Sequence, residues 1–135
     1  MTEILVTDQL IHLYNDRVSY AMALLEGGIP AHLYFGPRVA QVNPASILRH
    51  YGLAADGSFS MQNCAMNRVL QEYPSYGLGD MREDALIIRR QDGTASCDLR
   101  LVSAEVTEGK YGIPGLPAAF GDNARTLRLT LRTSC

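Results

Sequence analysis

The chain has 135 residues, of which 47% are hydrophobic and 19% charged, a balance that excludes an intrinsically disordered polymer. Its length is typical of a single domain with a real hydrophobic core. The 12 Lys and Arg residues are scattered and the net charge is −2, so no nucleic-acid footprint is expected. No apolar run approaches the roughly 20 residues of a membrane-spanning helix, so no membrane contact is expected.

Three cysteines, Cys64, Cys97 and Cys135, are unevenly spaced and odd in number. This pattern favours a reducing, cytoplasmic location over a disulfide framework. The first ten residues lack the basic start of a secretory signal, which agrees with that location. Without paired His and Cys spacing, neither a zinc site nor a cofactor is expected.

The first half of the chain predicts three strands. Residues 10–14 form the first strand and residues 31–35 the third, with a hairpin turn at residues 26–30. Between them, residues 17–25 (RVSYAMALL) alternate large and small side chains. Ala, Met and Leu leave a helix open for this segment, but turn residues on both sides favour a strand.

Residues 43–52 carry the best helix signal in the chain. Asn43 can accept hydrogen bonds from the first free amides, and Pro44 fits the first helical position. Gly52 is a plausible left-handed stop. The segment after this helix, residues 56–70, is irregular in pattern, and we expect Phe59 and Met61 to anchor it in the core.

The second half predicts a hairpin followed by a final strand. Residues 85–91 and 96–107 are expected to pair across the Asp92-Gly93 turn, a strong type I′ signal. Residues 125–133 (RTLRLTLRT) alternate cleanly, with the leucines facing inward. About seven strands and one short helix predict an all-β fold, an antiparallel β-sandwich formed as a single domain by residues 1–135.

The segment Gln71–Asp84 (QEYPSYGLGDMRED) is unlike a core strand or helix. Tyr73 and Tyr76 either cap the core or present aromatic faces to a sugar or a protein. Asp80 and Arg82 would share one face of an extended segment, as a structural ion pair or as ligand contacts. Glycines in this segment lack the flanking pattern of a phosphate loop.

Histidines offer a weaker catalytic hypothesis. His12 and His32 lie in predicted strands and could face each other across the sheet. No serine or cysteine is placed beside either by the sequence, so a hydrogen-bonded strand histidine is the simpler interpretation. A small enzyme built on His32 and Asp80 remains a third hypothesis.

Four ordered motifs run through nearly the whole chain. They are His32–Gly36 (HLYFG), Gln71–Gly77 with Gly79–Arg82 (QEYPSYG, GDMR), Gly109-Lys110 with Gly115–Ala118 (GK, GLPA) and Thr126–Leu129 (TLRL). In these motifs the chain resembles the N-terminal region of bacterial α-galactosidases of glycoside hydrolase family 36.

The resemblance implies a parent enzyme with a large β-sandwich, a (β/α)8 barrel and a small C-terminal β-domain. In that family two aspartates of the barrel cleave terminal α-galactosides with retention. It therefore implies that this chain is the first, non-catalytic part of the sandwich, with no catalytic residue of its own. The implied partners are the missing barrel domain, further copies in a homo-oligomer, and a galactoside at the rim.

The resemblance also points to sugar contacts. The loop that reaches a neighbouring subunit's sugar site in the family corresponds to residues 46–58. This chain departs from the family there, because Asp56-Gly57-Ser58 stands where an arginine is expected before Phe59. The candidate substrate-binding residues are Tyr76, Asp80, Arg82, Arg49 and Asp56.

The alternative function is a stand-alone carbohydrate-binding β-sandwich module that uses Tyr73, Tyr76 and Arg82. Under the main hypothesis, Leu127 and Leu129 would be poorly covered in an incomplete sandwich, and its open strand edges would favour self-association.

Overall fold

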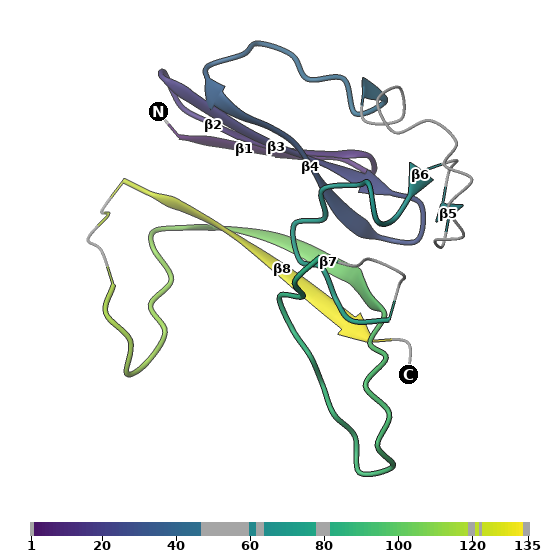
Figure 1. The fold of residues 1–135 in the computed structure, drawn as a ribbon. Helices are drawn as coiled ribbons and strands as arrows, with labels where there is room; N and C mark the ends of the chain where they lie inside the picture. The colour runs from purple at the N-terminus through teal and green to yellow at the C-terminus, as the bar shows by residue number, and fades with distance from the viewer. Residues whose placement is uncertain are drawn as a thin grey trace.

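The computed structural model describes residues 2–46, 60–61, 64–77, 82–118, 121 and 123–133, with the backbone alone for residues 60, 61, 64 and 65. In these ranges every regular element is a β-strand and all strand pairs are antiparallel. Figure 1 shows two layers, a four-stranded sheet and a two-stranded ribbon. The predicted all-β, sandwich-like fold is confirmed.

The first layer is a meander of four strands in chain order. They are β1 (Glu3–Val6), β2 (Leu10–Tyr14), β3 (Val18–Leu25) and β4 (Ile29–Pro37). The strand interpretation of the third predicted segment is confirmed over the helix. β4 is longer at both ends than predicted, and β1 was not predicted, because its ILV run does not alternate. A bulge between Ala21 and Met22 shifts the register of β3 against β4.

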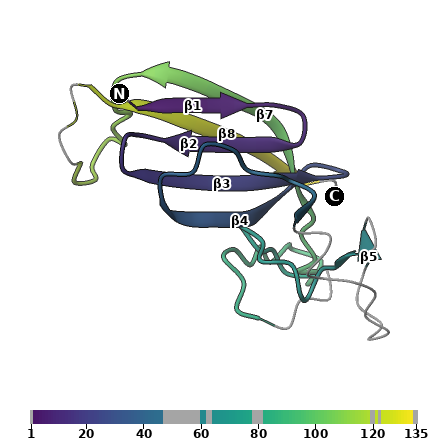
Figure 2. The same ribbon diagram turned by 90° about the horizontal axis from the view of Figure 1, so that it is seen from above.

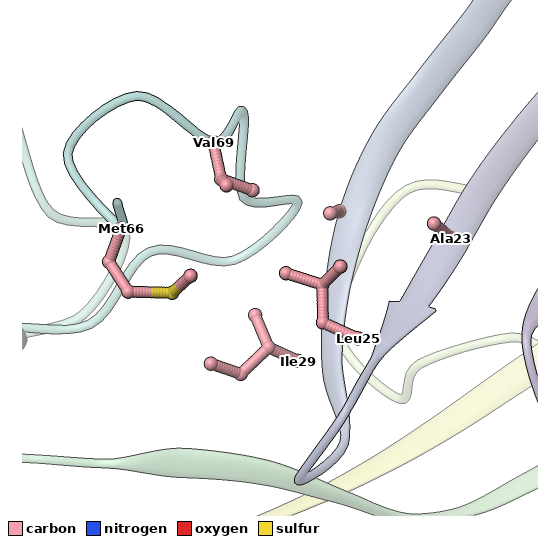
Figure 3. Close-up of a cluster of buried hydrophobic side chains, with 6 residues drawn as sticks. Ala23, Leu25, Ile29, Met66 and Val69 are labelled. Atoms are coloured by element: carbon pink, nitrogen blue, oxygen red, sulfur yellow. The ribbon is translucent and has the colours of Figure 1, made fainter. Parts of the chain in front are cut away.

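One face of this sheet carries the main hydrophobic cluster (Figure 3). The cluster consists of Ala23, Leu25, Ile29, Ala31, Met66 and Val69, with Leu33 packed against it. Met66 and Val69 follow two short strands, β5 (Ser60–Met61) and β6 (Cys64–Ala65), and both are fully buried. They anchor the segment that appeared irregular in the sequence. The expected anchors, Phe59 and the Met61 side chain, lie outside the described residues.

Residues 38–46 cross the same face further along the sheet. Figure 2 shows this segment passing over the sheet on the side away from the ribbon. The hydroxyl of buried Ser19 accepts a hydrogen bond from the Val39 amide at 3.1 Å, and the Arg38 guanidinium lies 4.1 Å from the centre of the Tyr14 ring.

The expected helix at residues 43–52 lies mostly outside the described residues. At its predicted start, the Asn43 side chain accepts a hydrogen bond from the Ala45 amide at 3.0 Å, as the sequence predicts. Residues 47–52 are not described. Among the residues that are, no helix is long and apolar enough to span a bilayer.

The second layer is the ribbon of β7 (Leu99–Glu108) and β8 (Arg125–Thr133). Its inner face pairs Leu101 with Leu131 and Ala104 with Leu129. The exposed side chains of β8 alternate with half-buried leucines, which confirms the predicted bounds and alternation of this strand. On the outer face the Arg128 guanidinium lies 2.5 Å from a carboxylate oxygen of its cross-strand neighbour Glu105.

The predicted hairpin between residues 85–91 and 96–107 is wrong. A turn forms here, but it is not the predicted type I′ turn centred on Asp92-Gly93. The Gly93 amide donates to the Arg90 carbonyl at 3.0 Å, so Gln91 and Asp92 are the central residues, and Gly93, with φ +85°, follows them. Residues 85–91 make only an isolated bridge, between Leu86 and Ser75, and are not a strand. β7 pairs instead with β8, whose leucines give it a continuous apolar face that residues 85–91, with Ile87 exposed, do not offer.

Candidate functional site

The segment Gln71–Gly77 is fixed along the free edge of β4. The His32 amide donates to the Leu70 carbonyl at 2.6 Å, and the Glu72 amide donates to the Pro30 carbonyl at 3.1 Å. Ala31 and Gln71 form an antiparallel bridge between these two bonds. The segment therefore extends the sheet by one short stretch, and this places the Glu72 side chain over β3 and β4.

Glu72 joins two strands through its carboxylate. The Tyr20 hydroxyl donates to one carboxylate oxygen, and Nδ1 of His32 lies 2.9 Å from the other. The two rings are in contact, with centroids 5.7 Å apart, and Phe35 meets Tyr20 edge-on at 6.0 Å. The Glu72 side chain is 20% exposed and the His32 side chain 32%, so water screens this cluster only in part.

Burial, followed by the hydrogen bond and the negative charge of Glu72, raises the pKa of Tyr20 well above its ordinary value. Tyr20 therefore stays protonated and acts as a hydrogen-bond donor. Glu72 uses both oxygens to hold side chains of the same chain, an arrangement suited to fixing the segment. The described residues contain no group of three or more His, Cys, Asp or Glu that could hold a metal ion.

A cavity of about 490 Å³ adjoins this cluster, between the two layers. Leu129 and Leu131 of β8 line it from the ribbon, and Tyr20 lines it from the sheet. Glu72 and Tyr73 also line it. The cavity is a gap in the interior of the sandwich, with a largely apolar lining.

Tyr76 is 49% exposed, and its backbone is held from the ribbon side. The Tyr76 carbonyl accepts a hydrogen bond from the Cys97 amide at 2.8 Å, and the Cys97 side chain is buried. The next residue, Gly77, has φ +109°, and a Cβ there would lie 2.5 Å from Oγ of Ser96. A side chain at this position would clash with Ser96 and strain the backbone, so the position favours glycine.

Arg82 makes structural contacts. One guanidinium nitrogen donates to the carbonyls of Val69 and of Met66, the latter at 3.3 Å. It therefore clasps the turn that carries two side chains of the main hydrophobic cluster. Of the other sequence-predicted site residues, Asp80, Arg49 and Asp56 lie outside the described residues, and so does any Asp80–Arg82 ion pair.

The two strand histidines do not meet. His12 pairs with Ala21 and His32 with Met22, and consecutive residues of β3 point to opposite faces. His12 is 3% exposed, and no partner of its Nε2 atom lies within the described part of the chain. Burial, and then the positive charge of Arg38, lowers the pKa of His12.

A second cleft, of about 710 Å³, lies at the opposite end of the layers, and most of the residues that line it are polar. There Arg125 of β8 lies 2.9 Å from carboxylate oxygens of both Glu3 and Glu108. The pair with Glu3 ties the ribbon to β1, and the pair with Glu108 joins β8 to β7 within the ribbon. Its lining includes Gly109 of the Gly109-Lys110 motif but none of the candidate substrate-binding residues.

Sequence reasoning missed the Tyr20–Glu72–His32 cluster. Glu72 lies inside the segment Gln71–Asp84, but the pattern of that segment pointed to its tyrosines and to Asp80 and Arg82. Tyr20 is 52 positions away from Glu72, and no spacing rule connects them. Only the pairing of β3 with β4, and of β4 with the Gln71 segment, brings the three side chains together.

The chain is similar to known proteins over most of its length. Residues 28–135 match the family described as glycosyl hydrolase family 36 N-terminal domain. The α-galactosidase AgaA of Geobacillus stearothermophilus is 32% identical over 89% of this chain and 17% of its own length. The bifunctional α-galactosidase/sucrose kinase AgaSK of Mediterraneibacter gnavus is 33% identical over 91% of this chain and 14% of its own length.

The fold agrees with these similarities. The solved structure of an AgaA variant from Geobacillus stearothermophilus in complex with raffinose superposes with a TM-score of 0.80. It is 29% identical and covers 93% of this chain and 18% of its own. The chain thus spans about one sixth of the length of these relatives. On the family match and this shared fold, the chain belongs to the glycosyl hydrolase family 36 N-terminal domain family.

Proposed function

We propose that this chain is the N-terminal, non-catalytic β-sandwich portion of an α-galactosidase that hydrolyses terminal α-galactosides. Its role is to provide scaffold and oligomer contacts. The activity is inferred from the names of the relatives. The chain covers only a small share of their length, which supports a non-catalytic role for it.

The observation that carries this proposal is the incomplete cover of the interior in the part of the chain that the structure describes. A four-stranded sheet is opposed by a two-stranded ribbon, and the leucines of β8 remain half-buried beside a cavity of about 490 Å³. Phe35 is 70% exposed although its ring contacts Tyr20 on the inner face. An interior this open is expected of a unit that packs against further protein.

Docking of the Gln71–Gly77 segment fits the same role. The Glu72 carboxylate contacts Tyr20 and His32. The Arg82 guanidinium donates to the turn at residues 66–69. Gly77 allows the close approach of Ser96. These contacts give the surface a fixed shape. We further propose a cytoplasmic setting, supported by the buried free thiol of Cys97.

The second candidate function is a stand-alone carbohydrate-binding module. Tyr73 and Tyr76 favour it, because they are 43% and 49% exposed and can offer aromatic faces to a sugar ring. One guanidinium nitrogen of Arg82 donates to the carbonyls of Met66 and Val69, which favours a structural role for Arg82 over a sugar contact.

Isothermal titration of the 135-residue chain with galactose, melibiose and raffinose separates the two functions. The scaffold proposal expects no saturable heat up to millimolar sugar. Saturable binding that is lost in Tyr76→Ala, and retained in the matched exposed-tyrosine variant Tyr111→Ala, would replace it with the binding module. Tyr111 is 59% exposed and lies on the loop between β7 and β8, away from the Gln71 segment.

A further inference from the structure

The turn at residues 90–94 contains the Asp92-Gly93 pair, to which the proposed function gives no role. Asp92, Gly93 and Thr94 are all exposed, and nothing lies within 4 Å of a Cβ built on Gly93. Glycine places no side chain beside its own amide, so the amide nitrogen can approach the carboxyl carbon of the preceding aspartate. The pair is therefore a candidate site of spontaneous chemical modification.

The reaction in question joins the Gly93 nitrogen to Cγ of Asp92. The neutral carboxyl group loses its hydroxyl, which leaves with the amide proton as water, and a five-membered succinimide ring forms. Water then opens the ring by breaking the bond between the nitrogen and the backbone carbonyl of Asp92. The chain now runs through the side-chain carbonyl, and the former backbone carbonyl becomes a free carboxylate. The product is an isoaspartate, and no oxidant or reductant is required.

Thr94 holds the carboxylate that would have to react. Its backbone amide donates to Oδ1 of Asp92 at 2.9 Å, and its hydroxyl donates to the same oxygen at 2.7 Å. These two hydrogen bonds, and to a smaller extent the positive charge of Arg90, lower the pKa of Asp92. Because only the neutral carboxyl group can leave as water, a carboxyl group held in its ionised form resists ring closure.

The turn also restrains the attacking nitrogen. The Gly93 amide donates to the Arg90 carbonyl at 3.0 Å, and the Arg90 amide donates to the Thr94 carbonyl at 2.9 Å. The Gly93 amide must leave its hydrogen bond before the nitrogen can bond to Cγ of Asp92. Both reacting groups are therefore engaged within the same turn.

We propose that Asp92-Gly93 is a site of isoaspartate formation in this chain, and that Thr94 slows the reaction by holding the Asp92 carboxylate in its ionised form. The inference goes beyond the proposed function and does not depend on a parent enzyme or on assembly.

The position of the turn gives the modification a structural consequence. The Arg90 guanidinium donates to the Ser96 carbonyl at 2.8 Å, and the Cys97 amide donates to the Tyr76 carbonyl at 2.8 Å. An isoaspartate lengthens the backbone shortly before these two contacts. It therefore adjoins the residues that hold the Gln71–Gly77 segment from the ribbon side.

Two substitutions of Thr94 test its role. Thr94→Val keeps the shape of the side chain and removes the hydroxyl donor, whereas Thr94→Ser keeps the donor. The 135-residue chain is incubated, and isoaspartate at residue 92 is measured by peptide mapping with electron-transfer fragmentation. At about pH 6, Thr94→Val is expected to raise the rate about threefold, because more of the carboxyl group is neutral. Thr94→Ser is expected to remain near the original rate.

Two controls separate the turn from the local sequence. A synthetic peptide of residues 89–96 lacks the folded turn, so it is expected to isomerise faster than the chain, and equally fast with threonine or valine at residue 94. Asp56-Gly57 is a second Asp-Gly pair in the same chain. Its rate is measured in the same samples and should be equal in the original chain and in Thr94→Val.

Titration of the Asp92 carboxyl carbon by NMR shows whether Thr94 acts through ionisation. Thr94→Val should raise the pKa of Asp92 toward its value in the peptide, and Thr94→Ser should leave it low. Equal isomerisation rates in the original chain and Thr94→Val, or a faster rate in Thr94→Val with an unchanged titration, overturn the role of Thr94. No isoaspartate at residue 92 of Thr94→Val, under conditions in which the peptide isomerises, overturns the site itself.

Discussion

Nδ1 of His32 lies 2.9 Å from Oε1 of Glu72, and this contact joins β4 to a segment 40 residues further along the chain. The other oxygen of the same carboxylate accepts a hydrogen bond from Tyr20 of β3. Glu72 thus fastens the Gln71–Gly77 segment to two strands at once. The Gln71–Gly77 segment, whose composition stands out in the sequence, is therefore held in place by Glu72.

Replacing Glu72 should destabilise the fold. Glu72→Ala leaves the hydroxyl of Tyr20 and the ring of His32 without their acceptor in a partly buried site, which is expected to cost about 1–3 kcal/mol of unfolding free energy. Urea denaturation measures the change. The matched control is Glu83→Ala, at an exposed position, and equal losses in the two variants would contradict a fastening role for Glu72.

Arg82→Ala should act on stability and leave sugar affinity unaltered. It frees the carbonyls of Met66 and Val69 and is expected to lower the unfolding free energy by about 1 kcal/mol. Arg89→Ala, at an exposed arginine, is the control and should be near neutral. An Arg82→Ala variant with an unchanged unfolding free energy would show that these hydrogen bonds do not contribute to stability.

Gly77→Ala should be more damaging than Gly93→Ala. Both glycines have positive φ, +109° and +85°, so each substitution brings backbone strain of about 1–2 kcal/mol. At Gly93 nothing lies within 4 Å of an added Cβ, whereas at Gly77 Oγ of Ser96 is 2.5 Å away. Thermal unfolding of the two variants compares their combined steric and backbone costs, and equal shifts in Tm would contradict the close approach.

Stability should fall as the pH drops below about 6.5. The pKa of His12 is lowered in the folded chain, so below the ordinary value near 6.5 the unfolded chain binds more protons than the folded one. Unfolding free energy then decreases by up to about 1.4 kcal/mol for each pH unit until the lowered pKa is reached. Urea denaturation between pH 5 and pH 7 should show this slope reduced in His12→Leu, and unchanged slopes would contradict the assignment.

Local pattern was enough to predict the regular strands. β8 was predicted with its observed bounds because leucine alternates with polar residues over its whole length. β2 and β3 were predicted because turn residues flank them. β1 was missed, since four residues without alternation carry no period, and its place is set by pairing with β2.

The pairing of strands that lie far apart in the chain could not be predicted from local sequence patterns. A turn was predicted at Asp92-Gly93, and the turn that forms has Gln91 and Asp92 at its centre; the strand partner of β7 lies beyond the following loop in β8. The hairpin was predicted wrongly because residues 85–91 are the apolar run nearest to β7 in the sequence. Likewise the hydrogen bonds from Arg82 to the backbone carbonyls of Met66 and Val69 are contacts that no side-chain pattern reveals.

The central claim is that this chain supports an α-galactosidase without performing its chemistry. The most direct test is to incubate the purified 135 residues with a chromogenic α-galactoside and follow release of the chromophore. The account predicts a rate equal to the buffer blank at every protein concentration. Turnover that copurifies with the chain and rises in proportion to its concentration would contradict it.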